Sequence, residues 1–232
     1  MEFDSITLDV LQPPLFEFGE ATPGALELFP AVWSAAEELV SPELAVRQRG
    51  LARLEEMGAA RFSPLVAYLL FTRLSDADAA LRRQVTYLLS GLLIPDERGF
   101  AAPEPVRRYV TAALGQMRTR PIFGMLEVLA ADLGAEPILA RLLNACPHAG
   151  RHLVDILSER KNPLAVRYAA ARMIGRVGYL DAIPALERLA ARLETRRSGQ
   201  QAMPFAAMPA SGADEVDLLP AITEALTRLQ AP

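Results

Sequence analysis

The sequence has few of the side chains that most often carry catalysis or hold metal ions. Its 232 residues include one cysteine and two histidines, and among its 24 basic residues only Lys161 is a lysine. The single Cys146 excludes a disulfide within the chain, in agreement with a reducing compartment. There is no glycine-rich phosphate loop, no G-x-S-x-G and no H-E-x-x-H. The common sequence signatures of nucleotide binding, acyl hydrolysis and zinc proteolysis are therefore missing.

Long apolar runs are missing too, although 51% of the residues are hydrophobic and the composition is that of a folded protein. No stretch reaches the ~20 consecutive apolar residues that a membrane-spanning helix needs. The start, Met1 to Asp4, has neither the basic nor the apolar region of a secretory signal. We therefore expect a cytoplasmic protein without membrane contact.

Basic residues are absent from the first fifth of the chain. Met1 to Val46 contains nine acids and no Lys or Arg, whereas the remainder holds all 24 basic residues and 19 acids, a net charge of +5. One hypothesis is that the acidic start lies on a basic surface of its own chain or of a second copy. The excess of arginine has two open interpretations: recognition of carboxylates or phosphates, or a bias in nucleotide composition.

The chain divides into a short non-helical arm and a long helical body. Residues 1–25 show β-branched alternation interrupted by Pro13-Pro14, which predicts an acidic extended arm with one or two short strands. From Leu26 onward apolar residues recur with a helical period, which predicts one all-α domain over 26–232. The expected helices are 26–40, 42–57, 63–74, 77–93, 103–117, 121–133, 135–145, 149–159, 163–177, 180–195 and 215–229.

One segment near the end of the chain breaks this period. Residues 198–213 contain two prolines, two glycines and no charged residue, so we predict a flexible loop. The helix before it carries Arg188, Arg192 and Arg196 at intervals of four, opposite an apolar face. Helix 163–177 has a broader apolar surface, which predicts that it is covered on more than one side.

A short pattern recurs along the body: a turn residue, often Pro, then Val or Leu followed by Arg, then small apolar residues. Its Arg positions are Arg47, Arg82, Arg107 and Arg167, at steps of 35, 25 and 60 residues. The fullest copy is Asn162-Pro163-Leu164-Ala165-Val166-Arg167, which is followed by Ile174-Gly175-Arg176-Val177-Gly178 and by Asp181-Ala182-Ile183-Pro184. Recurrence at such intervals is typical of stacked helical repeats.

This pattern resembles the HEAT repeat family in its short bacterial form, most closely over Asn162 to Ala191. The resemblance implies a right-handed α-solenoid of about five helix pairs with a concave face. It also implies that the Arg of each Val-Arg pair, such as Arg47 and Arg167, contacts backbone or an acid of the next unit. Helical repeats bury their apolar faces only against neighbours, so the arm and the last helix would cap the stack.

Several further arginines are candidate binding residues. In the pairs Arg82-Arg83 and Arg107-Arg108, the second arginine adds a guanidinium on an adjacent helix face. Stacking of the repeats would align these side chains as a basic ridge. The simpler interpretation is that they form a solvated surface without a ligand. The candidates are Arg82, Arg83, Arg107, Arg108, Arg188 and Arg192. For metals, Cys146, His148 and His152 are weak candidates, because no fourth ligand of the right type is nearby. We expect no cofactor.

The expected function is that of a protein–protein interaction scaffold, or adaptor, that binds an unidentified partner along the concave face without catalysis. An alternative is nucleic-acid binding, as in the HEAT-like glycosylases that act on alkylated bases, although the body lacks the strong basic footprint of a DNA-binding domain. A further alternative is a modifier similar to the HEAT-like bilin lyases. The sequence does not indicate the oligomeric state.

Overall fold

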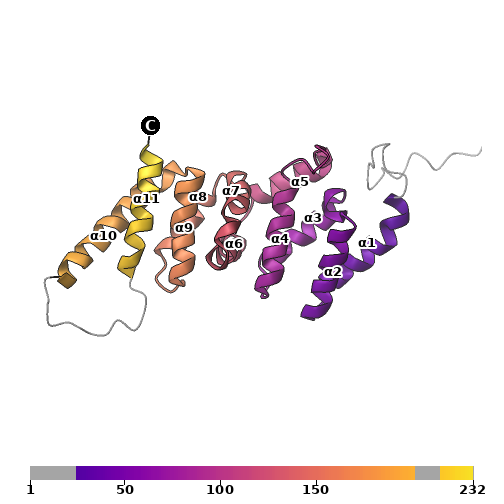
Figure 1. Ribbon diagram of the computed structural model, residues 1–232, viewed down its shortest axis with the longest axis horizontal. Coiled ribbons are helices and arrows are strands. Elements are labelled where there is room, and N and C mark those ends of the chain that lie inside the picture. The colour runs from indigo at the N-terminus through magenta and orange to yellow at the C-terminus, as the bar shows by residue number, and fades with distance from the viewer. Residues whose placement is uncertain (1–24, 202–214, 232) are drawn as a thin grey trace, which may run out of the picture.

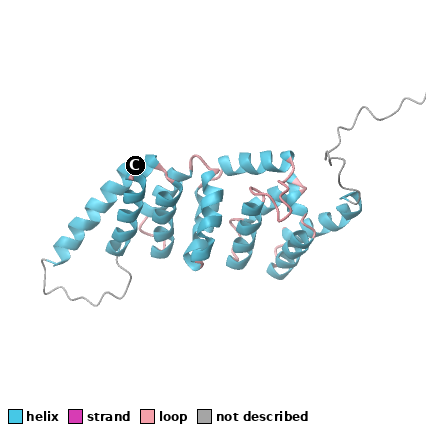
Figure 2. Cartoon of the chain, turned by 45° about the horizontal axis from the view of Figure 1, so that its top comes forward, coloured by secondary structure: helices cyan, strands magenta, loops and turns pink. Residues whose placement is uncertain are grey.

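The computed structural model describes residues 25–201 and 215–231, and this part of the chain consists of helices joined by turns, without any strand (Figure 2). Its α-helices are α1 (Ala25–Leu39), α2 (Leu44–Glu56), α3 (Pro64–Arg73), α4 (Ala79–Gly91), α5 (Glu104–Gly115), α6 (Thr119–Ala131), α7 (Glu136–Asn144), α8 (Ala149–Ser158), α9 (Leu164–Val177), α10 (Ile183–Gln201) and α11 (Leu219–Gln230). The prediction of an all-α protein is confirmed for these residues.

The helices form an elongated array with α1 at one end and α10 and α11 at the other (Figure 1). Helices α2, α4, α7, α9 and α11 contact one another in this order, and we call them row A. Row B comprises α1, α3 and α5, which contact one another in order, together with the contacting pair α8 and α10. Helix α6 lies between the rows and contacts α4, α7 and α9 as well as α8.

Helices α3 and α4 each begin at a residue whose side chain caps the helix. The Ser63 hydroxyl accepts a hydrogen bond from the backbone N–H of Val66 at 3.2 Å, and Pro64 follows as the first residue of α3. Asp78 caps α4 by accepting from the N–H of Leu81 at 2.8 Å. Such caps satisfy N–H groups that have no partner within the helix, and a proline in the first turn removes one of them.

One continuous apolar core runs along the array, and α9 lies deepest in it. Val166, Ala170, Met173 and Ile174 are all buried, and α9 contacts α6, α7, α8 and α11. The prediction that this helix is covered on more than one side is confirmed. In α10, by contrast, Leu186, Leu189 and Ala190 are buried on one face only.

Glycines allow two of the closest helix contacts. A Cβ atom added to Gly124 of α6 would lie 2.3 Å from the carbonyl oxygen of Leu74, at the end of α3. One added to Gly175 of α9 would lie 2.7 Å from the Cα atom of Ala225 in α11. A real Cβ atom does not approach other atoms this closely, so these positions need glycine for packing rather than for an unusual backbone angle.

The prediction of a loop over 198–213 is wrong at its beginning, because Ser198 to Gln201 continue α10. Gly199 weakens a helix by only about 1 kcal/mol, and the glutamines beside it are good helix formers, so the helix passes through this point. Residues 202–213 lie outside the described part of the chain. The predicted arm over 1–25 also lies outside it, except for Ala25, which begins α1.

The predicted helix 215–229 is confirmed with one difference. Its first turn, Glu215–Leu218, is a separate 3-10 turn, η5, and the α-helix begins at Leu219. Among the described residues, no helix has the length and apolar character needed to cross a membrane.

Candidate anion-binding site

Three arginines of row A share one structural role. Arg47, at the start of α2, donates to the carbonyl oxygens of Ser41 and Pro42 in the turn before its own helix, at 3.1 and 2.8 Å. It also forms an ion pair with Asp76, in the turn before α4, at 3.0 Å. Because Asp76 is almost fully buried, this guanidinium joins two successive helices of row A through a desolvated contact.

Arg82 and Arg167 repeat this arrangement further along the row. Arg82 of α4 donates to the carbonyl oxygens of Asp76 and Ala77 and pairs with Glu127 of α6 at 3.0 Å. Arg167 of α9 donates to the carbonyl oxygen of Leu157 at 2.7 Å and pairs with a carboxylate from η5. We call Arg47, Arg82 and Arg167 the arginine ladder. The expected structural contacts of Arg47 and Arg167 with backbone and with an acid of the following segment are therefore present.

The carboxylate that Arg167 binds belongs to Glu215, and three more arginines converge on it. Arg167 and Arg192 approach its Oε1 atom at 2.6 and 3.0 Å. Arg196 and Arg160 approach Oε2 at 3.4 and 3.5 Å. We call these five residues the Glu215 cluster, in which four guanidinium groups from α9, α10 and the turn after α8 share one carboxylate.

Burial and charge act in opposite directions on Glu215. Its side chain is 9% exposed, and burial alone would raise the pKa of its carboxyl group. The hydrogen bond and charge of Arg167, together with the charges of Arg192 and Arg160, outweigh burial and hold this pKa below its ordinary value. Glu215 is therefore a carboxylate at neutral pH.

The arginines of the cluster differ in their exposure. Arg167 is buried, whereas Arg160 and Arg192 have side chains that are 64% and 46% exposed. Arg192 donates one N–H group to Glu215, and Arg160 forms an ion pair with it at 3.5 Å, whereas a guanidinium has five N–H groups. Arg188 lies one turn before Arg192 on the exposed face of α10 and forms no ion pair within the described residues. Guanidinium donors of three arginines thus remain directed toward solvent in this region.

The other predicted arginines do not join this group. Arg82 is buried in the ladder. Arg83 pairs with Asp132 at 3.0 Å and lies over the ring of Tyr87. Arg107 pairs with Glu104 in its own helix, and Arg108 is exposed on α5. The structure thus brings together Arg188 and Arg192 from the candidate set and distributes the remainder over α4 and α5.

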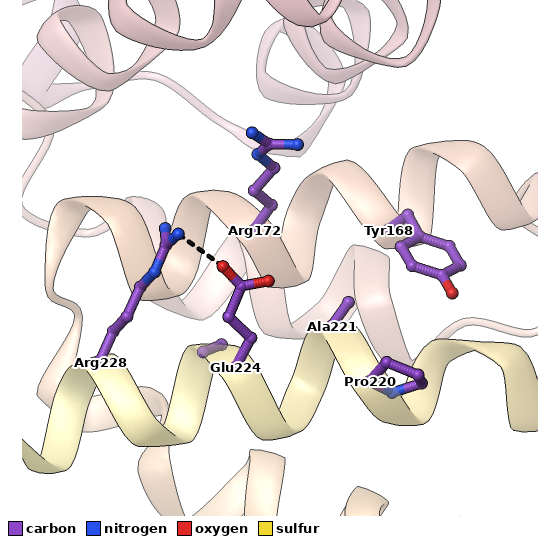
Figure 3. A pocket seen from close by; sticks show the side chains of 7 residues that line it. Tyr168, Arg172, Pro220, Ala221, Glu224 and Arg228 are labelled. Atoms are coloured by element: carbon purple, nitrogen blue, oxygen red, sulfur yellow. Dashed lines mark hydrogen bonds and ion pairs between the residues drawn. The ribbon is translucent and has the colours of Figure 1, made fainter.

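A hollow between α9 and α11 adjoins η5. It has a volume of about 190 Å³ and is lined by Tyr168 and Arg172 of α9 and by residues of α11, among them Pro220 and Ala221. Figure 3 shows these side chains around the opening, with Arg228 paired to Glu224 at 2.5 Å. The hydroxyl of Tyr168 donates to the carbonyl oxygen of Asp217, so the hollow meets the turn that carries Glu215.

A second hollow, of about 310 Å³, lies between α2 and α4. Leu54 and Glu55 line it from α2, and Tyr87 and Leu88 line it from α4. Both hollows therefore lie between neighbouring helices of row A, and each has a tyrosine at its wall.

The three weak metal candidates do not form a ligand set. Cys146 is buried, and burial raises the pKa of its thiol. His148 is exposed, while Nδ1 of His152 lies 3.0 Å from the hydroxyl oxygen of Thr119. Nowhere in the described part of the chain do three His, Cys, Asp or Glu side chains come close enough together to hold a metal ion.

No family model and no curated protein matches this chain. The likeness to HEAT repeats therefore stays a prediction from the residue pattern.

The sequence pattern does not predict Arg160 and Glu215 as residues of this cluster. Glu215 is separated from Arg160 by 55 positions in the sequence, and nothing near either residue predicts their contact. The one sequence signal for this region is the spacing of Arg188, Arg192 and Arg196, which places three guanidiniums on one helix face.

Proposed function

We propose that this chain is a HEAT-like helical repeat protein, a right-handed solenoid that acts as a scaffold and binds a partner protein along row A. The observation that carries the proposal is the position of the two hollows, each between consecutive helices of that row. A row of similar helices with shallow hollows offers a partner an extended contact surface.

The helix contacts support a repeat architecture. Helix α1 packs on α2, α3 on α4, α8 on α9 and α10 on α11, and the second member of each pair belongs to row A. Arg47 and Arg167 of the arginine ladder each add a contact to the next part of this row, while Arg82 contacts α6. Helices α5, α6 and α7 form a less regular middle section, and the Val-Arg pattern is absent from α6 and α7.

Site-specific photo-crosslinking tests this function. A photo-reactive benzophenone side chain would replace Tyr87 or Tyr168, each at the wall of a row A hollow. Matched controls would carry the same group in place of Arg108 or Arg151, which are exposed on row B. Each full-length variant would be illuminated in a lysate of the organism from which the sequence comes.

We expect both row A positions to give a covalent adduct with the same protein and the row B positions to give none. Equal adducts at the Arg108 and Arg151 controls would show that the contacts are not specific to the row A hollows and would contradict the proposal. No adduct at Tyr87 and Tyr168 in correctly folded variants would also contradict it.

A further inference from the structure

We propose that the exposed arginines around the Glu215 cluster form a docking site for an acidic, extended peptide segment of the partner. This inference rests on the scaffold function proposed above, extends the partner's contact from row A onto α10 and the turn after α8, and names the chemistry of the ligand. The site consists of Arg160, Arg188 and Arg192, with Glu215 and Arg167 as its buried floor.

A carboxylate is the ligand class that this region already holds. Arg167 and Arg192 bind the same oxygen of Glu215 at distances typical of charge-assisted hydrogen bonds. Three guanidiniums donate hydrogen bonds to that single carboxylate, which has about four lone-pair sites, and Arg160 forms an ion pair with it. The exposed N–H groups of Arg160 and Arg192 that do not contact Glu215 are accessible to a further acceptor, and a second carboxylate supplies one with matching planar geometry.

The spacing of Arg188 and Arg192 along α10 matches the spacing of side chains in an extended peptide. Arg188 and Arg192 are four residues apart on α10, which corresponds to about 6 Å along the helix axis. Alternate side chains of an extended peptide point to the same side at intervals of about 6.6 Å. A peptide with acids at every second position therefore presents one carboxylate to each arginine in turn.

The position of Glu215 explains why the site keeps excess positive charge. This carboxylate lies deep enough to neutralise the buried Arg167, the last member of the arginine ladder. Arg160 and Arg192 reach it from the surface with one contact each and remain about half exposed or more. The resident carboxylate therefore stabilises the fold without covering the outer guanidinium faces.

Fluorescence anisotropy with a labelled peptide tests the inference. The probe is an eight-residue peptide of alternating Glu and Ser, and the control probe has Gln in place of every Glu. Binding to the full chain would be measured at about 50 mM and at about 150 mM salt, because exposed charge pairs weaken as salt screens them. We expect binding of the Glu probe that weakens at the higher salt, and no binding of the Gln probe.

Two single variants and a matched control locate the site. Arg188→Gln and Arg192→Gln should each weaken binding about threefold, and the double variant about tenfold, as expected for exposed ion pairs. Arg188 has no ion pair among the described residues, so its replacement leaves the Glu215 contacts in place. Arg108→Gln changes the net charge equally on α5 and should leave affinity unchanged.

Three outcomes would overturn the inference. The first is no binding of the Glu probe at either salt, and the second is a loss of affinity in Arg108→Gln as large as in Arg188→Gln or Arg192→Gln. The third is displacement of the probe by duplex DNA at a lower concentration than by unlabelled peptide. The last would identify phosphate as the preferred ligand. A row A crosslink combined with any of these results would leave the scaffold function standing and refute only the acidic-peptide site.

Discussion

Replacement of Gly124 by alanine should destabilise the protein, although alanine is the better helix former. The new Cβ atom would lie 2.3 Å from the carbonyl oxygen of Leu74 and 3.3 Å from Cδ of Arg82. Because the nearest atom is backbone, α6 must move by about 1 Å to reach an ordinary contact distance, and such overpacking costs about 3 kcal/mol. The helix preference of alanine returns about 1 kcal/mol, which leaves a net loss of about 2 kcal/mol.

A loss of this size should lower the melting temperature by about 4–8 °C for a chain of this length. Far-ultraviolet circular dichroism would follow the melting of the full chain. Gly199→Ala is the matched control, since Gly199 lies within α10 and an added Cβ would meet nothing within 4 Å. Equal or higher melting temperature for Gly124→Ala than for Gly199→Ala would refute the packing argument.

Three further predictions follow from buried or charged groups. The contacts with Arg167 lower the pKa of Glu215 in the folded state. They therefore stabilise the folded protein above the pKa of the unfolded chain, about 4.3, and this stabilisation is lost as pH falls through the lower pKa of the folded state. Glu215→Gln should thus lower the melting temperature at pH 7 and reduce its decline in acid; an unchanged profile would contradict this. Asp76→Ala should cost about 3 kcal/mol in chemical denaturation, because Arg47 would remain desolvated without its acid, whereas Glu104→Ala, at an exposed pair, should change stability little. Cys146 should react with a thiol reagent far more slowly in the native protein than in denaturant, because it is buried and its thiol pKa is raised; equal rates would contradict the buried position.

The sequence predicted the helices well because their signals are local. The apolar faces of α9 and α10 and the turn residues Ser63 and Asp78 are visible within a few neighbouring positions. The error at Ser198 to Gln201 has the same origin, because the turn signals there are weak and are outweighed by the helix formers around Gly199. Local preferences identify a helix more surely than they identify its end.

The candidate site was predicted only in part because it depends on distant residues. The spacing of Arg188 and Arg192 on one helix face follows from helix geometry. That Arg160 and Glu215 lie beside them depends on how α8, α10 and η5 pack, which no local pattern specifies. In the same way, the doubling of Arg82 and Arg83 does not reveal that Arg82 is buried and pairs with Glu127 while Arg83 lies at the surface.

In the arginine ladder each arginine pairs with an acid that lies later in the chain, and this order affects how such a chain can change in length. Arg47 relies on Asp76, and Arg167 relies on Glu215, so each unit leaves a buried cation to be neutralised by the segment that follows. A duplicated unit would bring both an arginine and the acid that neutralises the arginine of the unit before it, so these contacts would be preserved. Deletion of the last segment would instead leave Arg167 desolvated without a counter-charge, which costs several kcal/mol. Such an array therefore lengthens more readily than it loses its final helix.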